Sequence, residues 1–124
     1  MAATGEFPAV FQRLKAILAP HAPRLLVKTD TADVYYLDTA HVMPNKLPLF
    51  FGAAQVKKNY VSFYLFPVYM YPEMLEGLSP GLRKRMQGKS CFNFTQVDEP
   101  LLEELASLTN AGMARFEAVG YVGR

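Results

Sequence analysis

Apolar residues recur along the chain with two different periods. Near both ends they come every three or four residues, which is the spacing of an amphipathic helix. Pro20 ends the first helix, and Asp98 and Pro100 are typical of the start of the last one. Asn110 and Gly112 weaken the middle of the last helix and would allow a kink there. The predicted buried faces are Phe7, Val10, Phe11, Leu14, Ile17 and Leu18 in the first helix, and Leu101, Leu105, Leu108 and Phe116 in the last.

Between these helices the period falls to two, and β-branched and aromatic residues become common, which indicates strands. "RLLVKT" and "DVYYLDT" flank the polar turn "DTAD", while "LFFGAAQV" and "NYVSFYLF" flank "KK" and predict a hairpin. "SCFNFT" predicts one more strand. "HVMPNKLP" is predicted to be a loop, and "PVYMYP" interrupts the strand pattern. Ser79 and Gly88 are typical caps of a short helix over residues 80–87.

The order of these elements is helix, four strands, short helix, strand, helix. Successive strands with short connections favour an antiparallel sheet, and the long helices need an apolar surface to cover. The predicted fold is therefore α+β, a two-layer sandwich of about five antiparallel strands with the N- and C-terminal helices on one face. The length suits a single domain, residues 1–124.

Composition and charge limit the kinds of molecule that this protein is expected to bind. Apolar residues make up 51% of the chain and charged residues 19%, which excludes a disordered protein. The net charge of +2 is too small to indicate nucleic-acid binding. Residues 24–97 hold nine basic residues against five acidic ones. That excess favours an anionic ligand, or it reflects solvated surface charge.

The sequence favours a cytoplasmic protein with no membrane partner. No stretch approaches the roughly 20 apolar residues of a membrane helix. The first residues lack the basic opening and the unbroken apolar run of a signal peptide. Cys91 is the only cysteine, so no internal disulfide can form, which fits a reducing compartment.

The sequence contains no clear phosphate-binding loop, zinc site or nucleophilic dyad. Gly81 and Gly88 are separated by a predicted helix, unlike the glycines of a phosphate-binding loop. His21 and His41 lack the paired spacing of a zinc site. Cys91 beside a histidine would form a nucleophilic dyad, and packing among phenylalanines is the simpler interpretation.

The acidic residues of the first hairpin are candidates for a metal site. Asp30, Asp33 and Asp38 would bind a hard cation if they converged across the first hairpin, or they form a solvated surface. No arrangement of residues predicts a catalytic group, a metal site or a cofactor. The sequence therefore favours a non-enzymatic binding or interaction protein.

The last strand of the predicted hairpin has two different faces. One is uniformly apolar and suits the core, whereas the other is aromatic and amphipathic and suits an open face. Lysines at the starts of this strand and of the "SCFNFT" strand would form a basic rim if the two strands were neighbours. The open face is predicted to bind a small anionic ligand or a second copy in a homodimer. The alternative is that "HVMPNKLP" and "PVYMYP" cover its rings as a second small core. The core-facing set is Val61, Phe63, Leu65, Phe92 and Phe94. The predicted binding residues are Lys58, Tyr60, Ser62, Tyr64, Lys89, Cys91 and Asn93, with Phe66 on the same side.

Three features together carry a family resemblance. They are the apolar first helix, a proline-containing loop before "LFFGAAQVKKNYVSFYL", and "LRKRMQGKSCFNF" leading into the last helix. With these features the chain resembles the small bacterial YdhG-like family, a domain family of unknown function. Lys57 or Lys58 matches the family's lysine before a strand, and Gly88 and Lys89 match its Gly-Lys entry into the last strand. The resemblance implies a frataxin-like arrangement of two helices on an antiparallel sheet, and intracellular iron handling as an alternative function.

Overall fold

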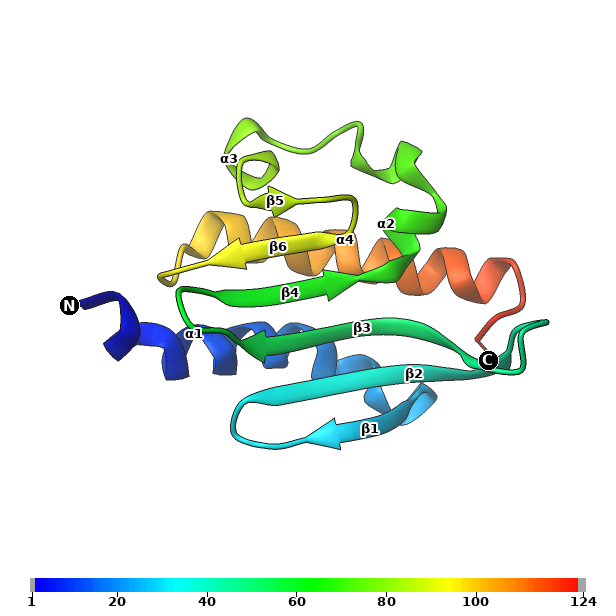
Figure 1. Cartoon of the computed structure of the whole chain (residues 1–124). Coiled ribbons are helices and arrows are strands. Elements are labelled where there is room, and N and C mark those ends of the chain that lie inside the picture. The colour runs from blue at the N-terminus through cyan, green and yellow to red at the C-terminus, as the bar shows by residue number, and fades with distance from the viewer. Residues whose placement is uncertain (1, 123–124) are drawn as a thin grey trace.

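Two long helices lie behind one face of an antiparallel sheet (Figure 1). The structure is a computed structural model that describes residues 2–122, with side chains from residue 6 onward. The helices are α1 (Ala2–Leu18) and α4 (Glu99–Ala118), and they contact each other. In the described part of the chain no helix is long and apolar enough to cross a membrane. The predicted α+β two-layer sandwich, with both long helices on one face, is confirmed.

The described residues form six strands in the order β1-β2-β3-β4-β6-β5, and every neighbouring pair is antiparallel. The β1–β2 turn is closed by the Thr31 hydroxyl, which accepts hydrogen bonds from the backbone N–H groups of Asp33 and Val34. The predicted "HVMPNKLP" loop is a tighter turn, because both flanking strands extend into it. The strands are β1 (Leu26–Asp30), β2 (Val34–Val42), β3 (Pro48–Val56), β4 (Val61–Leu65), β5 (Met86–Gln87) and β6 (Cys91–Phe94).

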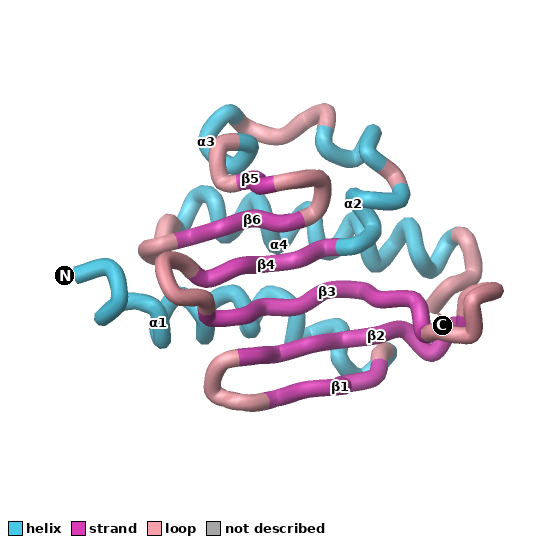
Figure 2. The backbone as a smooth tube through the Cα atoms, viewed as in Figure 1, coloured by secondary structure: helices cyan, strands magenta, loops and turns pink. Residues whose placement is uncertain are grey.

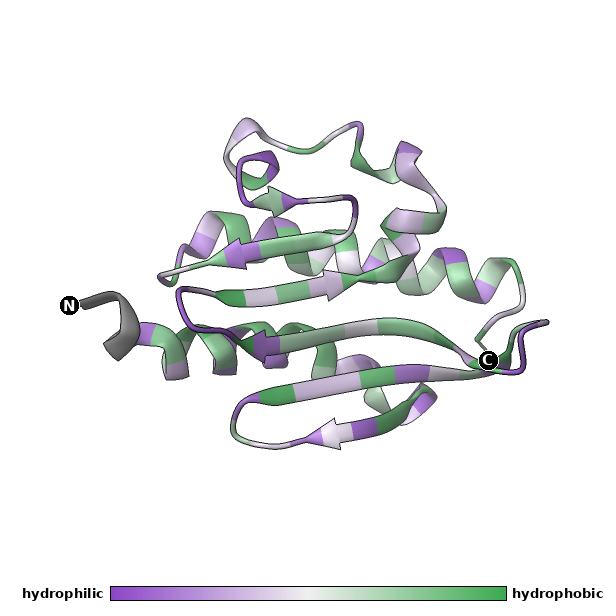
Figure 3. Ribbon diagram, viewed as in Figure 1, coloured by the Kyte–Doolittle hydropathy of each residue, from purple (hydrophilic) through white to green (hydrophobic). Residues whose placement is uncertain are grey.

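The core lies between the sheet and the two long helices. The predicted stripes of α1 and α4 are buried there, with Ile17 and Leu101 at half-buried positions. Apolar and polar residues alternate along β4 and β6 (Figure 3), and the apolar set faces the helices. This predicted core set of Val61, Phe63, Leu65, Phe92 and Phe94 is buried as expected.

The helix predicted over residues 80–87 is wrong in its second half. Ser79 caps α3 (Pro80–Arg83) as expected, and its side chain accepts a hydrogen bond from the Leu82 N–H. The chain then becomes β5, because the Arg85 carbonyl accepts a hydrogen bond of 2.8 Å from the backbone N–H of Asn93. Gly88, with φ +79, turns the chain back into β6. The edge of β6 therefore decides where the helix ends.

The segment after β4 is helical, whereas its sequence predicted only an interruption of the strand pattern. Phe66 begins α2 (Phe66–Met70), and η2 (Pro72–Leu75) follows. Each has a proline near its start, where the missing N–H leaves no hydrogen bond unmade. Figure 2 shows this segment and α3 along the β5 side of the sheet. A similar short helix, η1 (Ala19–Arg24), follows α1 at Pro20.

Candidate functional site

The pairing of β4 with β6 brings most of the predicted binding residues together. Ser62 lies opposite Asn93, and Tyr64 lies opposite Cys91. These four side chains share a sheet face with each other, because directly paired residues point to the same side. Their neighbours Phe63 and Phe92 point into the core, so this is the face opposite α1 and α4. The two strands are neighbours, as the predicted site requires.

Hydrogen bonds join three strands across this face. The Ser62 hydroxyl donates to Asn93 Oδ1 at 2.7 Å, and the Asn93 amide donates to Gln87 Oε1 of β5 at 2.6 Å. The Cys91 thiol lies 3.4 Å from the same Asn93 oxygen. Ser62 is only 1% exposed. Its hydroxyl therefore holds Asn93 in place and is not available to a ligand.

Cys91 is half-buried beside this network. Burial raises the pKa of its thiol, and hydrogen bonding with Ser62 and Tyr64 and the charge of Lys57 offset only part of that effect. The thiol is thus neutral near pH 7, whereas a nucleophilic cysteine needs a lowered pKa.

The contacts of both histidines lie elsewhere. His21 bonds Asn110 of α4 at 2.9 Å, and the ring of His41 packs against Tyr121. Neither contact supplies Cys91 with a base. The contacts of the described residues therefore give no support to a cysteine–histidine dyad.

The two predicted rim lysines lie at opposite ends of the paired strands. Lys58 precedes β4 and Lys89 precedes β6, and the two strands run in opposite directions. Both side chains are exposed. The lysine that contacts the predicted face is Lys57, whose Nζ lies 5.9 Å from the centre of the Tyr64 ring. Lys58 and Lys89 therefore do not form the single basic rim that the sequence predicted.

Other cations, Lys84 and Arg85, lie near this face just before β5. A pocket of about 320 Å³ lies where β4, β5 and β6 meet, and we call it the basic pocket. It contains the predicted Tyr60 and Asn93, and also Lys84 and Arg85, which the sequence placed at a helix end. The signal that could have revealed this arrangement is Gly88. It lies in the turn between β5 and β6 and does not cap a helix. The lining residues are Tyr60, Lys84, Arg85, Met86, Gln87, Asn93 and Thr95.

Several charged residues of the helices and their flanks form ion pairs, whereas the cations of the basic pocket form none within the described residues. The four ion pairs among the described residues all involve the helices or their flanks, and they join Arg13 to Glu99, Lys15 to Asp30, Arg24 to Glu117 and Arg115 to Glu73. Within the same part of the chain, Lys84 and Arg85 have no ion-pair partner, and no acidic residue lines the basic pocket. Asp98 lines the adjoining pocket with the same Lys84 and Arg85, and none of the four ion pairs joins it to them. The lining of the basic pocket itself is therefore positively charged.

Aromatic side chains extend the open face toward α2. Tyr36 stacks on Phe50 with ring centres 4.7 Å apart, Phe50 lies 6.0 Å from Phe66, and Phe66 stacks on Tyr69 at 5.2 Å. Phe66 and Tyr69 come from the segment "FPVYM", so this segment covers one end of the face. Tyr69 itself is 49% exposed. Residues of "HVMPNKLP" line a pocket together with Phe50 and Phe66. The second-core alternative thus has support at this end of the face, from both segments.

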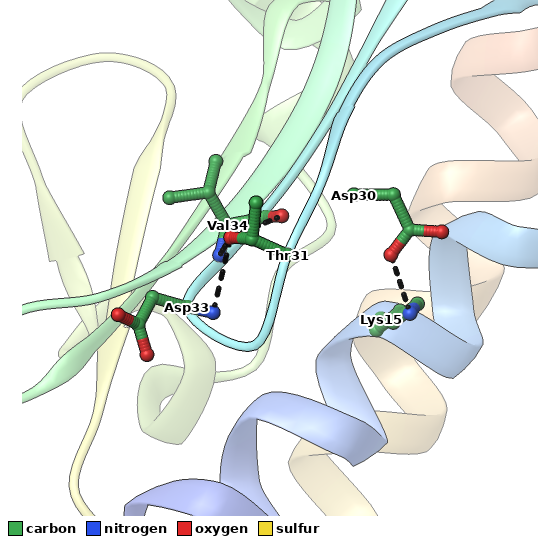
Figure 4. A network of polar contacts seen from close by, with 5 residues as sticks. All are labelled: Lys15, Asp30, Thr31, Asp33 and Val34. Atoms are coloured by element: carbon green, nitrogen blue, oxygen red, sulfur yellow. Dashed lines mark hydrogen bonds and ion pairs between the residues drawn. The ribbon is translucent and has the colours of Figure 1, made fainter.

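The three aspartates considered as a cation site do not converge. The Asp30 carboxylate points to α1, where it accepts from Lys15 Nζ at 2.8 Å, and the Asp33 carboxylate points away from it across the turn (Figure 4). Asp38 lies further along β2, opposite Leu26. In the described residues no group of three or more His, Cys, Asp or Glu is placed to hold a metal ion.

Asp38 has a different consequence, for stability. It is 7% exposed and forms no hydrogen bond or ion pair with another described side chain. Burial raises the pKa of its carboxyl above the usual range of an aspartate, with Lys28 opposing the shift. A raised pKa in the folded state means that stability is lost as the pH rises through that pKa. We therefore expect Asp38→Asn to increase the free energy of unfolding at pH 7, with a smaller gain at pH 4.

Urea denaturation of both proteins at the two pH values measures this effect. Asp33→Asn, at an exposed turn position, is the matched control and should change stability little at either pH. A destabilised Asp38→Asn protein at pH 7 would show that the carboxylate makes a favourable interaction that outweighs its burial.

Comparisons with protein-family models, with curated proteins and with solved structures gave no match to this chain. The resemblance to the YdhG-like family therefore remains a prediction from the sequence.

Proposed function

We propose that this protein binds a small, polar anionic ligand in the basic pocket, at the end of its open sheet face. One observation carries the proposal. The pocket is lined by two cations and no acid, whereas the basic residues of the helical layer are paired with carboxylates. Positive charge without a protein partner attracts anions, most strongly where several donors meet in a concave site.

The groups around the pocket suit an oxyanion. The Arg85 guanidinium can bind a carboxylate or phosphate through two parallel hydrogen bonds, and Lys84 adds a second positive charge. Tyr60 and Thr95 bring hydroxyl groups to the same pocket. The Asn93 side chain is held in place from both sides by Ser62 and Gln87, which makes the floor of the pocket rigid. A rigid floor lowers the entropy cost of binding.

The pocket's size indicates a small ligand. Its volume of about 320 Å³ lies at the lower end of the roughly 300–1,000 Å³ typical of small-molecule sites. The iron-handling alternative finds no comparable support, because the aspartates of the first hairpin point in different directions. We therefore favour binding of an organic or inorganic polyanion.

Isothermal titration calorimetry with citrate and with pyrophosphate tests this function. We expect saturable binding that weakens as salt is added, because salt screens exposed charges. Arg85→Gln should weaken binding at least about tenfold, since a hydrogen bond to a charged group contributes about 1.5–3 kcal/mol. The matched control is Lys46→Asn in the β2–β3 turn, which removes one charge far from the pocket at a residue with φ 70 that asparagine tolerates.

Two results would contradict the proposal. One is the absence of binding heat for both anions at millimolar concentration and low salt. The other is equal weakening by Arg85→Gln and Lys46→Asn, which would reduce the effect to overall charge. A stronger effect of Arg85→Gln on only one anion would identify the preferred class, carboxylate or phosphate.

A further inference from the structure

A second pocket adjoins β5, and Met86 lines both this pocket and the basic pocket. It is formed by α2, η2, the end of α3 and the β5–β6 turn, and its volume is about 580 Å³. That is well within the range of sites that enclose an organic molecule. We call it the α2 pocket. Its lining residues are Val68, Tyr69, Pro72, Leu75, Arg83, Met86, Gly88 and Lys89.

The lining of the α2 pocket is apolar apart from two cations. Val68 is fully buried, and Leu75 and Met86 are half-buried beside the main core. Leu75, Met86 and Tyr69 offer an apolar surface that excludes water from a hydrocarbon or aromatic group. A purely polar anion, such as the ligand proposed for the basic pocket, would gain nothing from this surface.

The two cations are Arg83 and Lys89. Arg83 donates one hydrogen bond, of 2.5 Å, from Nη2 to the Leu75 carbonyl, which fixes the guanidinium against η2 and uses one of its five N–H groups. Neither cation has an ion-pair partner among the described residues. Glu73, the acidic residue of η2, is bound to Arg115 of α4 at 3.0 Å and does not line the pocket. The charge of the α2 pocket is therefore positive.

We propose that the α2 pocket binds an amphipathic organic anion, a monocarboxylate with an apolar aliphatic or aromatic body. The body would contact Tyr69, Leu75 and Met86, and the carboxylate would pair with Arg83 and Lys89. An apolar floor beside two cations that have no ion-pair partner in the described part of the chain is the observation that selects an amphipathic anion. The two sites share only Met86 among their lining residues, and neither proposal depends on the other.

Displacement of a fluorescent probe, anilinonaphthalene sulfonate, tests the proposal on the full chain. Octanoate should displace the probe, because it carries both the apolar body and the charge. Octanol has the body without the charge, and acetate has the charge without the body. We expect both to displace the probe at least about tenfold less well than octanoate.

Variants assign the effect to the α2 pocket. Arg83→Gln and Lys89→Gln should each weaken octanoate binding several-fold, and Arg83→Lys should restore part of it. Lys89→Gln keeps the test valid if loss of the Arg83–Leu75 hydrogen bond unfolds the protein, because Lys89 is exposed. Arg85→Gln should leave octanoate binding intact while it weakens citrate binding, which separates this site from the basic pocket.

The proposal is overturned if octanol displaces the probe as well as octanoate does. It is also overturned if octanoate fails to displace the probe, or if both Arg83→Gln and Lys89→Gln bind octanoate like the unaltered protein. Circular dichroism of each variant confirms that the comparison is made between folded proteins.

Discussion

Phe63→Ala is expected to lower the free energy of unfolding by about 3–5 kcal/mol, the usual cost of removing a buried phenylalanine. Phe63 is fully buried in the middle of β4, between Ala54 of β3 and Phe92 of β6. Its loss leaves a cavity among rigid strands that pair on both sides, so the surroundings can collapse only in part. Urea denaturation followed by circular dichroism measures the change.

Tyr64→Ala is the matched control, because Tyr64 is adjacent in sequence and points to the open face. We expect it to cost clearly less than Phe63→Ala, since the tyrosine is only half-buried. Sedimentation of the same variant tests self-association through this face. Association of the unaltered protein that is lost in a stable Tyr64→Ala protein would place a homodimer interface there. A loss of stability equal to that of Phe63→Ala would mean that the open face is a second core.

Gly52→Ala should destabilise the protein by about 1–3 kcal/mol or more, the range for overpacking a tight core. A Cβ atom at this position would lie 2.9 Å from the Tyr64 carbonyl oxygen and 3.0 Å from Leu18 Cδ2. The first contact is with backbone in the centre of the sheet, so relief requires β3 and β4 to separate. The lower entropy of the unfolded chain returns at most about 1 kcal/mol.

Gly77→Ala makes the same substitution where the structure has room. No atom lies within 4 Å of a Cβ built there. We expect this variant to be unchanged or slightly more stable, by about 0.4–1 kcal/mol. Thermal and urea denaturation of the two variants side by side measure the difference. Equal stabilities would show that β3 and β4 accommodate a methyl group without cost.

The candidate site was only partly predictable, for a reason seen in Lys84 and Arg85. Local signals in "SPGLRKRMQG" favour a helix up to Gly88, and a helix would leave both side chains on a solvated surface. In the structure, hydrogen bonding to Asn93 converts residues 86–87 to a strand and brings Arg85 to the pocket beside Tyr60. Long-range hydrogen bonds of this kind leave no mark on the local pattern.

Gly112 shows the same limit in the last helix. Its low helix propensity predicted a weak point in the helix, and α4 continues through it to Ala118. A Cβ atom there would lie 3.0 Å from the ring of Pro67, so the glycine permits close packing of α2 on α4. Whether a glycine weakens a helix or accommodates a neighbour depends on what packs against it.

By itself the sequence determined the class of fold, the buried stripes of α1 and α4, the two faces of β4, and the caps at Ser79 and Asp98. All of these follow from residues close together in the chain, whose periodicity and capping groups act locally. The tertiary structure alone decided that β6 lies between β4 and β5, that Lys58 and Lys89 lie at opposite ends, and which cations remain unpaired. These outcomes depend on contacts between residues far apart in sequence, where strand pairing and packing select one arrangement among many that the local pattern allows.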